Sequence, residues 1–153
     1  MKNNRNAFTM IELVFVIVVL GILATIAMPR FAATRTDAII AKGRSDVSSI
    51  RAAISSERQK RFMTGSTDYI SALDHQGTTP GTGVTIFDNN GTAASTILTY
   101  GITTKNTDGG WMKTAANTYT YKVAGVTTTF TYNSADGTFN CVAGNGYCDK
   151  LTK

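Results

Sequence analysis

The apolar and polar positions divide the chain into three stretches. The first, residues 8–28, is apolar at most positions and holds one charged residue, Glu12. As a helix, these 21 residues extend about 31 Å. The hydrocarbon core of a bilayer is about 30 Å thick. We therefore predict a membrane-spanning helix over residues 8–28.

The second stretch, residues 29–63, has the periodicity of an amphipathic helix. Apolar side chains recur at steps of three and four residues, and charged side chains occupy other positions, as on a helix with one buried face. The apolar positions are Ile39, Ile40, Val47, Ile50, Ala53, Ile54 and Phe62. We predict that this stripe packs against the rest of the protein.

One long helix should therefore run from about Phe8 to about Arg61, with two special points. Pro29 directly follows the apolar run. A proline removes a backbone donor and crowds the preceding turn, so we expect a bend there. Gly43 is expected to be a second flexible point. Gly65 should stop the helix, because glycine readily adopts the left-handed conformation of a helix C-terminus.

The third stretch, residues 64–153, has a different pattern. Residues 64–110 are rich in Thr, Gly, Asn and Ser, and we predict short helices around residues 69–73 and 92–98. Further on, apolar residues alternate with polar ones, as in strands with one buried face. The alternating positions are Tyr119, Tyr121, Val123, Phe130, Tyr132, Phe139 and Cys141. The turns between them predict an antiparallel meander of three strands, or of four if residues 111–113 join it.

The apolar face of this meander needs a cover, and the helical stripe is the segment of matching length. The predicted fold class is therefore α+β. A long N-terminal helix, with a transmembrane half and an amphipathic half, would pack on a C-terminal antiparallel β-meander.

The junction between the leader and the apolar run carries a specific motif. Residues 1–7 form a short basic leader, and the chain continues with Phe8, Thr9, Met10, Ile11 and Glu12. In an ordinary secretory signal the small-residue cleavage site follows the apolar run. Here the small residue, Ala7, precedes it. The block resembles the processing signature of type IV prepilins and of type II secretion pseudopilins, in which the residue before the cut is usually Gly.

This resemblance implies cleavage between Ala7 and Phe8 by a prepilin peptidase, with methylation of the new Phe8 amine. It also implies a pilin-like fold in which the retained helix forms the core of a filament. The expected parts are a cytoplasmic leader at residues 1–7 and a transmembrane, filament-core helix at 8–28. The amphipathic half-helix at 29–63 and a periplasmic head at 64–153 would follow.

The implied function is that of a structural subunit and not of an enzyme. The subunit would belong to a pseudopilus that supports protein secretion or DNA uptake. Its expected partners are other pilin-like subunits in homo- and hetero-oligomers, the peptidase, an inner-membrane assembly platform with its ATPase, and membrane lipid. Two alternatives are open: a type IV pilin of a surface pilus, and a single-pass anchored protein whose head binds a partner without polymerising.

The expected location is the bacterial inner membrane. Lys2 and Arg5 precede the span, which favours a cytoplasmic N-terminus and a periplasmic head. Catalysis has little support: the single histidine, His75, lies beside Asp74 in a polar loop, and no activated nucleophile can be placed near it. We predict no catalytic residues.

Glu12 is the chief candidate for function, because a carboxylate in a membrane-spanning segment is costly and needs a physical reason. Two explanations are open. The side chain could reach toward the headgroups, or it could pair with the Phe8 amine of a neighbouring subunit, as the resemblance implies. Two such charges offset each other's desolvation only in good geometry. Glu12 would therefore specify axial register in a filament.

The two cysteines, Cys141 and Cys148, predict a disulfide that closes a short loop in an oxidising compartment. Its loop entropy corresponds to a stabilisation of about 2–3 kcal/mol. A metal site is the alternative, but it would need further ligands, and Asp149 is the one nearby.

Charge is concentrated in the second stretch, where residues 30–61 hold eight basic and three acidic side chains. These could form a solvated helix face, contact anionic headgroups, or pair with acids of another subunit. We predict no nucleic-acid binding, because the stretch holds few aromatic side chains that could stack on bases. Asp88 and Asp108 lie in oxygen-rich turns and are candidates for calcium, with plain turn chemistry as the alternative. No other cofactor is predicted.

Overall fold

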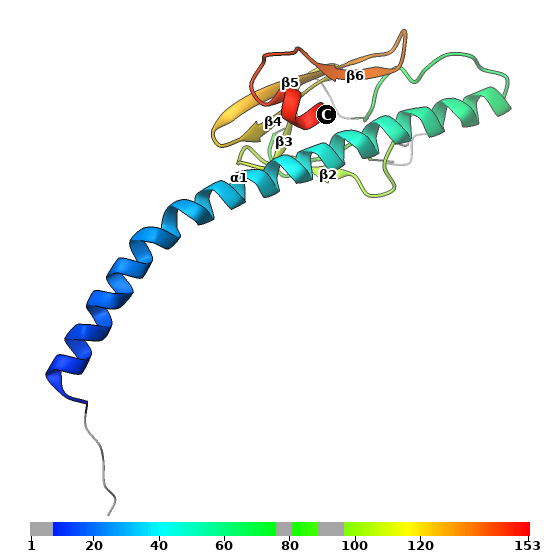
Figure 1. The fold of residues 1–153 in the computed structure, drawn as a ribbon. Coiled ribbons are helices and arrows are strands. Elements are labelled where there is room, and N and C mark those ends of the chain that lie inside the picture. Colours follow the sequence, from blue (N-terminus) through cyan, green and yellow to red (C-terminus); the bar gives the residue numbers. More distant parts are fainter. Residues whose placement is uncertain (1–7, 76–80, 89–96) are drawn as a thin grey trace, which may run out of the picture. The chain divides into compact units, whose positions relative to one another are not determined.

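The computed structural model describes residues 8–75, 81–88 and 97–153 (Figure 1). The chain forms two compact units, residues 1–36 and 37–153, and each is described by itself. The elements in chain order are α1 (Met10–Met63), β1 (Thr85–Ile86), β2 (Ile102–Thr103), β3 (Trp111–Ala115), β4 (Thr118–Val123), β5 (Val126–Asn133), β6 (Thr138–Cys141) and α2 (Cys148–Thr152). The fold is α+β, as the sequence predicts.

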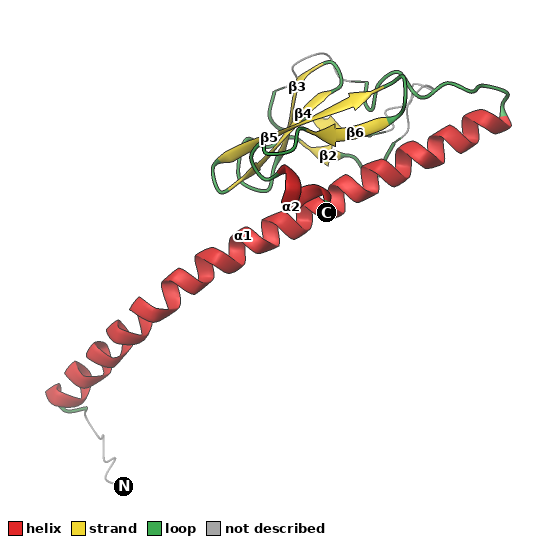
Figure 2. Ribbon diagram, turned by 45° about the horizontal axis from the view of Figure 1, so that its top comes forward, coloured by secondary structure: helices red, strands yellow, loops and turns green. Residues whose placement is uncertain are grey.

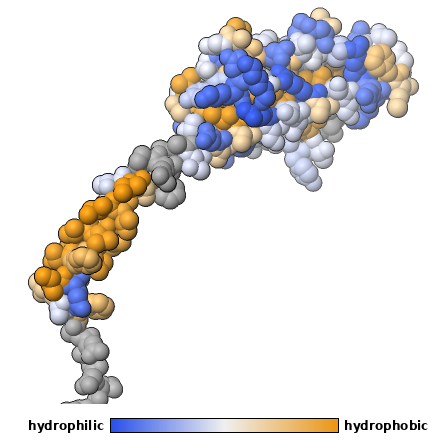
Figure 3. Space-filling view, in the orientation of Figure 1, coloured by the Kyte–Doolittle hydropathy of each residue, from blue (hydrophilic) through white to orange (hydrophobic). Residues whose placement is uncertain are grey.

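The first unit consists of the N-terminal part of α1. Its segment Met10–Met28 has a mean hydropathy of 2.8 and is long and apolar enough to cross a membrane. Figure 3 shows an almost continuous hydrophobic surface along it. The helix continues without interruption through Pro29, so the proline does not end it. The bend expected at Pro29 stays a prediction.

The C-terminal end of α1 is closed by its own backbone. Gly65 has a φ of 86°, and its N–H donates to the Phe62 carbonyl at 3.1 Å. The N–H of Ser66 donates to the Arg61 carbonyl at 2.9 Å. This pair of bonds is a Schellman motif, which satisfies carbonyls that the last turn leaves without partners. Gly65 therefore stops the helix as predicted, at Met63.

The second unit contains a four-stranded antiparallel sheet in the order β3-β4-β5-β6 (Figure 2). The four-stranded form of the predicted meander is therefore the one observed. Tyr119 pairs with Phe130, and Tyr132 pairs with Phe139, so the apolar residues of adjacent strands share one face. A separate two-stranded sheet joins β1 and β2.

The core lies between this face and the C-terminal part of α1. Four of the predicted helix positions, Ile40, Val47, Ile50 and Ile54, are buried, and Ile39 and Ala53 are partly buried against them. The aromatic residues that fill the sheet side are Trp111, Tyr119, Tyr121, Phe130, Tyr132 and Phe139. The pattern of the helix and the strands therefore located the core.

Phe62 is the exception in the stripe, because 49% of it is exposed. It lies in the last turn of α1, and the Arg58 guanidinium is 5.0 Å from its ring centroid. The same guanidinium lies closer to Tyr69, 3.8 Å from that ring centroid. The expectation that Phe62 packs into the core was wrong.

Gly43 is a packing position. It is buried, and α1 continues through it. A Cβ placed there would lie 2.7 Å from Leu151 Cδ2 and would overlap the ring of Tyr121. Glycine is therefore required because α2 and the sheet approach the helix backbone closely. The helix shows no interruption at Gly43, where we expected a flexible point.

The helix predicted around residues 69–73 is absent, and the segment is irregular. Its carbonyls are used by the sheet instead: the Tyr132 hydroxyl donates to Ile70 O at 2.8 Å, and Asn117 Nδ2 donates to Ser71 O at 2.9 Å. A helix would need such carbonyls for its own ladder. Most of the other predicted helix, around 92–98, lies outside the described residues. The sequence pattern also missed α2, which is five residues long.

Candidate functional site

The start of α1 is held by a reciprocal pair of side chains. The Thr9 N–H donates to Glu12 Oε2 at 2.8 Å, and the Thr9 hydroxyl donates to the same oxygen at 2.8 Å. In return, the Glu12 N–H donates to Thr9 Oγ1 at 3.3 Å. This is a capping box, which satisfies backbone donors that a helix start leaves without partners. The spacing Thr-x-x-Glu before an apolar run is its sequence signature, and the sequence reasoning above missed it.

The capping box fixes where the Glu12 carboxylate lies. Both bonds from Thr9 end on Oε2, and a carboxylate offers about four acceptor sites on its two oxygens. A capped Glu12 can therefore still accept a bond from a cation of another molecule. The positive end of the helix dipole also favours a negative charge in the first turn.

The residues of the predicted cleavage site are placed in part. Phe8 is described and 86% exposed. Ala7 and the rest of the leader lie outside the described residues. The amine that cleavage would create at Phe8 is one residue before Thr9, so it would adjoin the capping box. Cleavage after Ala7 and methylation of Phe8 stay predictions.

The apolar side chains that follow are exposed on every side of the helix within the first unit. Phe15 is 69% exposed, Leu20 57% and Ile26 59%. A helix that is apolar all round belongs in lipid or among other helices. This segment therefore fits a membrane anchor.

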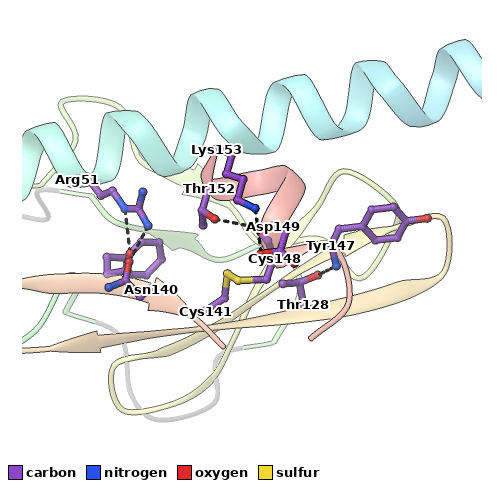
Figure 4. Close-up of a disulfide and its surroundings, with 10 residues drawn as sticks. Arg51, Thr128, Asn140, Cys141, Tyr147, Cys148, Asp149, Thr152 and Lys153 are labelled. Atoms are coloured by element: carbon purple, nitrogen blue, oxygen red, sulfur yellow. Dashed lines mark hydrogen bonds and ion pairs between the residues drawn. A yellow bond between two sulfur atoms is a disulfide. The ribbon is translucent and has the colours of Figure 1, made fainter. Parts of the chain in front are cut away.

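In the second unit a disulfide joins Cys141 to Cys148, with their Cα atoms 5.8 Å apart (Figure 4). It ties the end of β6 to the start of α2, as the spacing of the cysteines predicted. The adjacent Tyr147 N–H donates to Thr128 Oγ1 at 2.9 Å. Leu151 of α2 is 1% exposed and belongs to the core.

Two arginines of α1 hold the sheet and the C-terminal segment to the helix. Arg51 Nε donates to Phe139 O at 3.0 Å, and its Nη2 donates to Asn140 Oδ1 at 2.7 Å (Figure 4). Arg44 donates to Lys150 O from Nε at 3.2 Å and from Nη2 at 2.9 Å. Part of the basic charge therefore has an intramolecular role that none of the readings of the sequence included.

The two calcium candidates contact other parts of the head. Asp108 Oδ1 accepts the Gly125 N–H at 2.8 Å, and Asp88 Oδ1 lies 3.2 Å from His75 Nδ1. Within residues 8–75, 81–88 and 97–153, no group of three or more His, Cys, Asp or Glu side chains is placed to hold a metal ion. Calcium binding at Asp88 or Asp108 stays a prediction.

A buried polar cluster in the head was not predicted. Lys113 Nζ lies 2.6 Å from Asp74 Oδ1, and the side chains are 3% and 0% exposed. The Tyr119 hydroxyl donates to Asp74 Oδ2 at 2.6 Å. Burial, followed by the charge of Asp74, raises the pKa of Tyr119, so its hydroxyl stays protonated. The sequence signal was a lysine on the inward-facing register of a strand, at the position two after Trp111.

Comparison with known families gives one match. The model of the prokaryotic N-terminal methylation motif matches residues 2–28, which span the leader, the predicted cleavage site and the apolar segment. Neither the curated proteins nor the solved structures give a match.

Proposed function

Because residues 2–28 carry the N-terminal methylation motif, the prepilin signature of type IV pilins and pseudopilins, we propose that this chain is a structural subunit of a pseudopilus. The pseudopilus would belong to a type II secretion-like or transformation system. The motif match is the observation that carries this proposal. It supports a pilin-like substrate of prepilin peptidase with a structural rather than an enzymatic role.

The first unit supports polymerisation after processing. Its apolar side chains are exposed at successive positions around the helix, so a single copy is compatible with lipid. Figure 3 shows one face of this apolar surface. Leaving the bilayer would expose that surface to water unless copies of the same helix cover it. A bundle of these helices is therefore the natural core of a filament.

Glu12 would set the register of that bundle. The capping box fixes its carboxylate at the helix start, where the Phe8 amine of the next subunit can pair with it. An unpaired charge in such a low-dielectric core costs about 3–5 kcal/mol. A shifted neighbour leaves both groups unpaired, so the pair selects one axial offset between subunits.

The small head favours a pseudopilus over a long surface pilus. Its cysteine loop is short, with a sequence separation of 7, and its sheet has four strands in the described part. On this proposal the leader lies in the cytoplasm, α1 is anchored in the inner membrane, and the head lies in the periplasm. The assembly platform and its ATPase would extract the subunit from the membrane.

The test of processing is co-expression of the full chain with a prepilin peptidase, followed by mass spectrometry of the N-terminus. We expect loss of the seven-residue leader and one added methyl group on Phe8. Ala7→Gly should be processed equally, whereas Ala7→Leu should retain its leader because the site needs a small side chain. Retention of the leader by the native chain, with a control substrate cut in the same cells, would refute the proposal.

The test of assembly uses two substitutions at Glu12 that separate the charge from the cap. Glu12→Gln keeps an oxygen that can accept the Thr9 N–H but has no charge, and Glu12→Ala lacks both. We expect normal processing of both variants and loss of sedimentable filaments in both. Normal filaments from Glu12→Gln would show that Glu12 acts as a helix cap and not as the partner of an amine.

A further inference from the structure

The head contains a lysine that lies among the core side chains. Lys113 is on β3, where successive side chains alternate between the two faces of the sheet. Its register places it on the same face as Trp111, so its side chain enters the core and is 3% exposed. Its ammonium group lies 2.6 Å from Asp74 Oδ1, in a segment 39 residues earlier in the chain.

The surroundings of this pair exclude water. Asp74 is 0% exposed, and Lys113 Nζ lies 5.9 Å from the ring centroid of Tyr119. Phe87 packs on that ring with 4.5 Å between centroids. Two charges in such a site lose most of their hydration, and their attraction offsets this desolvation free energy only in part. Transfer of one proton from Lys113 to Asp74 makes both groups neutral and removes that cost.

We propose that Lys113 and Asp74 join in an isopeptide bond inside the folded head. One proton of the Lys113 ammonium moves to Asp74 Oδ1, which leaves an amine with a free lone pair. The nitrogen attacks Asp74 Cγ to form a tetrahedral intermediate. A second proton from the nitrogen reaches Oδ1, which departs as water. The product is a neutral amide, and the reaction consumes no other reagent.

Tyr119 is the catalytic residue of this step. Its hydroxyl donates to Asp74 Oδ2 at 2.6 Å, which is the oxygen that gains negative charge when the nitrogen attacks. A fixed donor at that oxygen stabilises the intermediate in the same way as an oxyanion hole. The fold also holds the amine against the carboxyl group. Effective molarities of such oriented intramolecular pairs reach about 10⁵–10⁸ M.

The bond would join two parts of the head that are distant in sequence. Asp74 belongs to the segment after α1, and Lys113 belongs to the outer strand β3. In that segment the Ile70 and Ser71 carbonyls also accept hydrogen bonds from the side chains of Tyr132 and Asn117. An amide there would keep the segment attached to the sheet when the noncovalent contacts open, which suits a subunit that bears tension.

The experiment is mass spectrometry of the purified full chain after disulfide reduction. We expect the head to be lighter than its sequence requires by one water molecule. Trypsin should fail to cut after Lys113, and a branched peptide should join residues 62–105 to residues 106–122. This peptide does not include the leader, so its result is independent of processing and of filament assembly.

The variants separate the residues of the step. Lys113→Arg should have the full mass, because a guanidinium does not form the amide, whereas Lys122→Arg on the outer face of the sheet should keep the missing water. Asp74→Asn should form the same amide with release of ammonia, and Tyr119→Phe should lower the converted fraction. A native chain with its full mass and normal cleavage after Lys113 would overturn the proposal, whether or not the variants fold. An unchanged fraction in Tyr119→Phe would overturn the role of Tyr119.

Discussion

Substitution of Gly43 by alanine tests whether this glycine serves packing. On helix propensity alone, Gly43→Ala should stabilise α1 by about 0.5–1 kcal/mol, because glycine is a poor helix former. The structure predicts the opposite effect, a destabilisation of the head. The new methyl group would lie 2.7 Å from Leu151 Cδ2 and would overlap the Tyr121 ring.

The size of the effect follows from how firmly these neighbours are held. The Tyr121 hydroxyl donates to Ile39 O at 2.8 Å, and Leu151 is 1% exposed. Neither can move without losing a hydrogen bond or core contacts. Overpacking of a core costs about 1–3 kcal/mol. After subtracting the propensity gain, we expect Gly43→Ala to lower the free energy of unfolding by about 0–2.5 kcal/mol.

The assay is urea unfolding of the detergent-solubilised chain, followed by the fluorescence of Trp111. This is the one tryptophan of the sequence. It is 0% exposed, and its ring centroid lies 4.9 Å from that of Tyr121. The matched control is Ala52→Gly at an exposed position of α1, which should cost about 1 kcal/mol through propensity alone. If Gly43→Ala stabilises the head by a similar amount, the packing argument is wrong.

Three further outcomes are expected in the same unfolding assay. Reduction of the disulfide between Cys141 and Cys148 should lower the free energy of unfolding by about 2–3 kcal/mol, and an unchanged midpoint with reductant would contradict this. Burial raises the pKa of Tyr121 to about 12 and also raises that of Tyr119, above the value of about 10 of an unfolded tyrosine. Their contribution to stability is therefore complete below about pH 10 and is lost as the pH rises toward 12. The urea concentration at the unfolding midpoint should fall over that pH range, while the absorbance of tyrosinate rises. Arg51→Ala, which removes two bonds to β6, should cost about 1–3 kcal/mol, and Arg51→Lys should recover only part of it because lysine lacks the planar fork.

The parts of the fold that the sequence predicted are those in which a repeating pattern faces one core. The stripe from Ile40 to Ile54 is buried, and so are the alternating residues from Tyr119 to Phe139. Burial of one face imposes a period of about 3.6 residues on a helix and of 2 on a strand. Phe62 departs from this pattern: it lies in the last turn of α1 and is 49% exposed.

The parts that were missed depend on contacts between distant residues. Asp74 and His75 look alike as polar loop residues, yet Asp74 is buried beside Lys113 and His75 is exposed. The position of Asp74 depends on a strand 39 residues away, so no local pattern could indicate it. The capping box differs, since Thr9 and Glu12 are three residues apart. It could have been predicted from the sequence, because Thr-x-x-Glu before an apolar run is a local signature.

The two units of the chain are under different physical constraints, which explains why the family match ends at Met28. On the proposed function, a peptidase, a bilayer and a helix bundle would all act on this short linear segment, so they would fix the small residue, the carboxylate and the length of the apolar run together. The head has only to bury one stripe of α1 under a sheet, and many sequences satisfy that requirement. An exposed position of the head, such as the 89% exposed Tyr100, is under no such packing constraint. Differences in role between subunits with this N-terminal motif should accordingly reside in the head, while processing and anchoring depend on the motif.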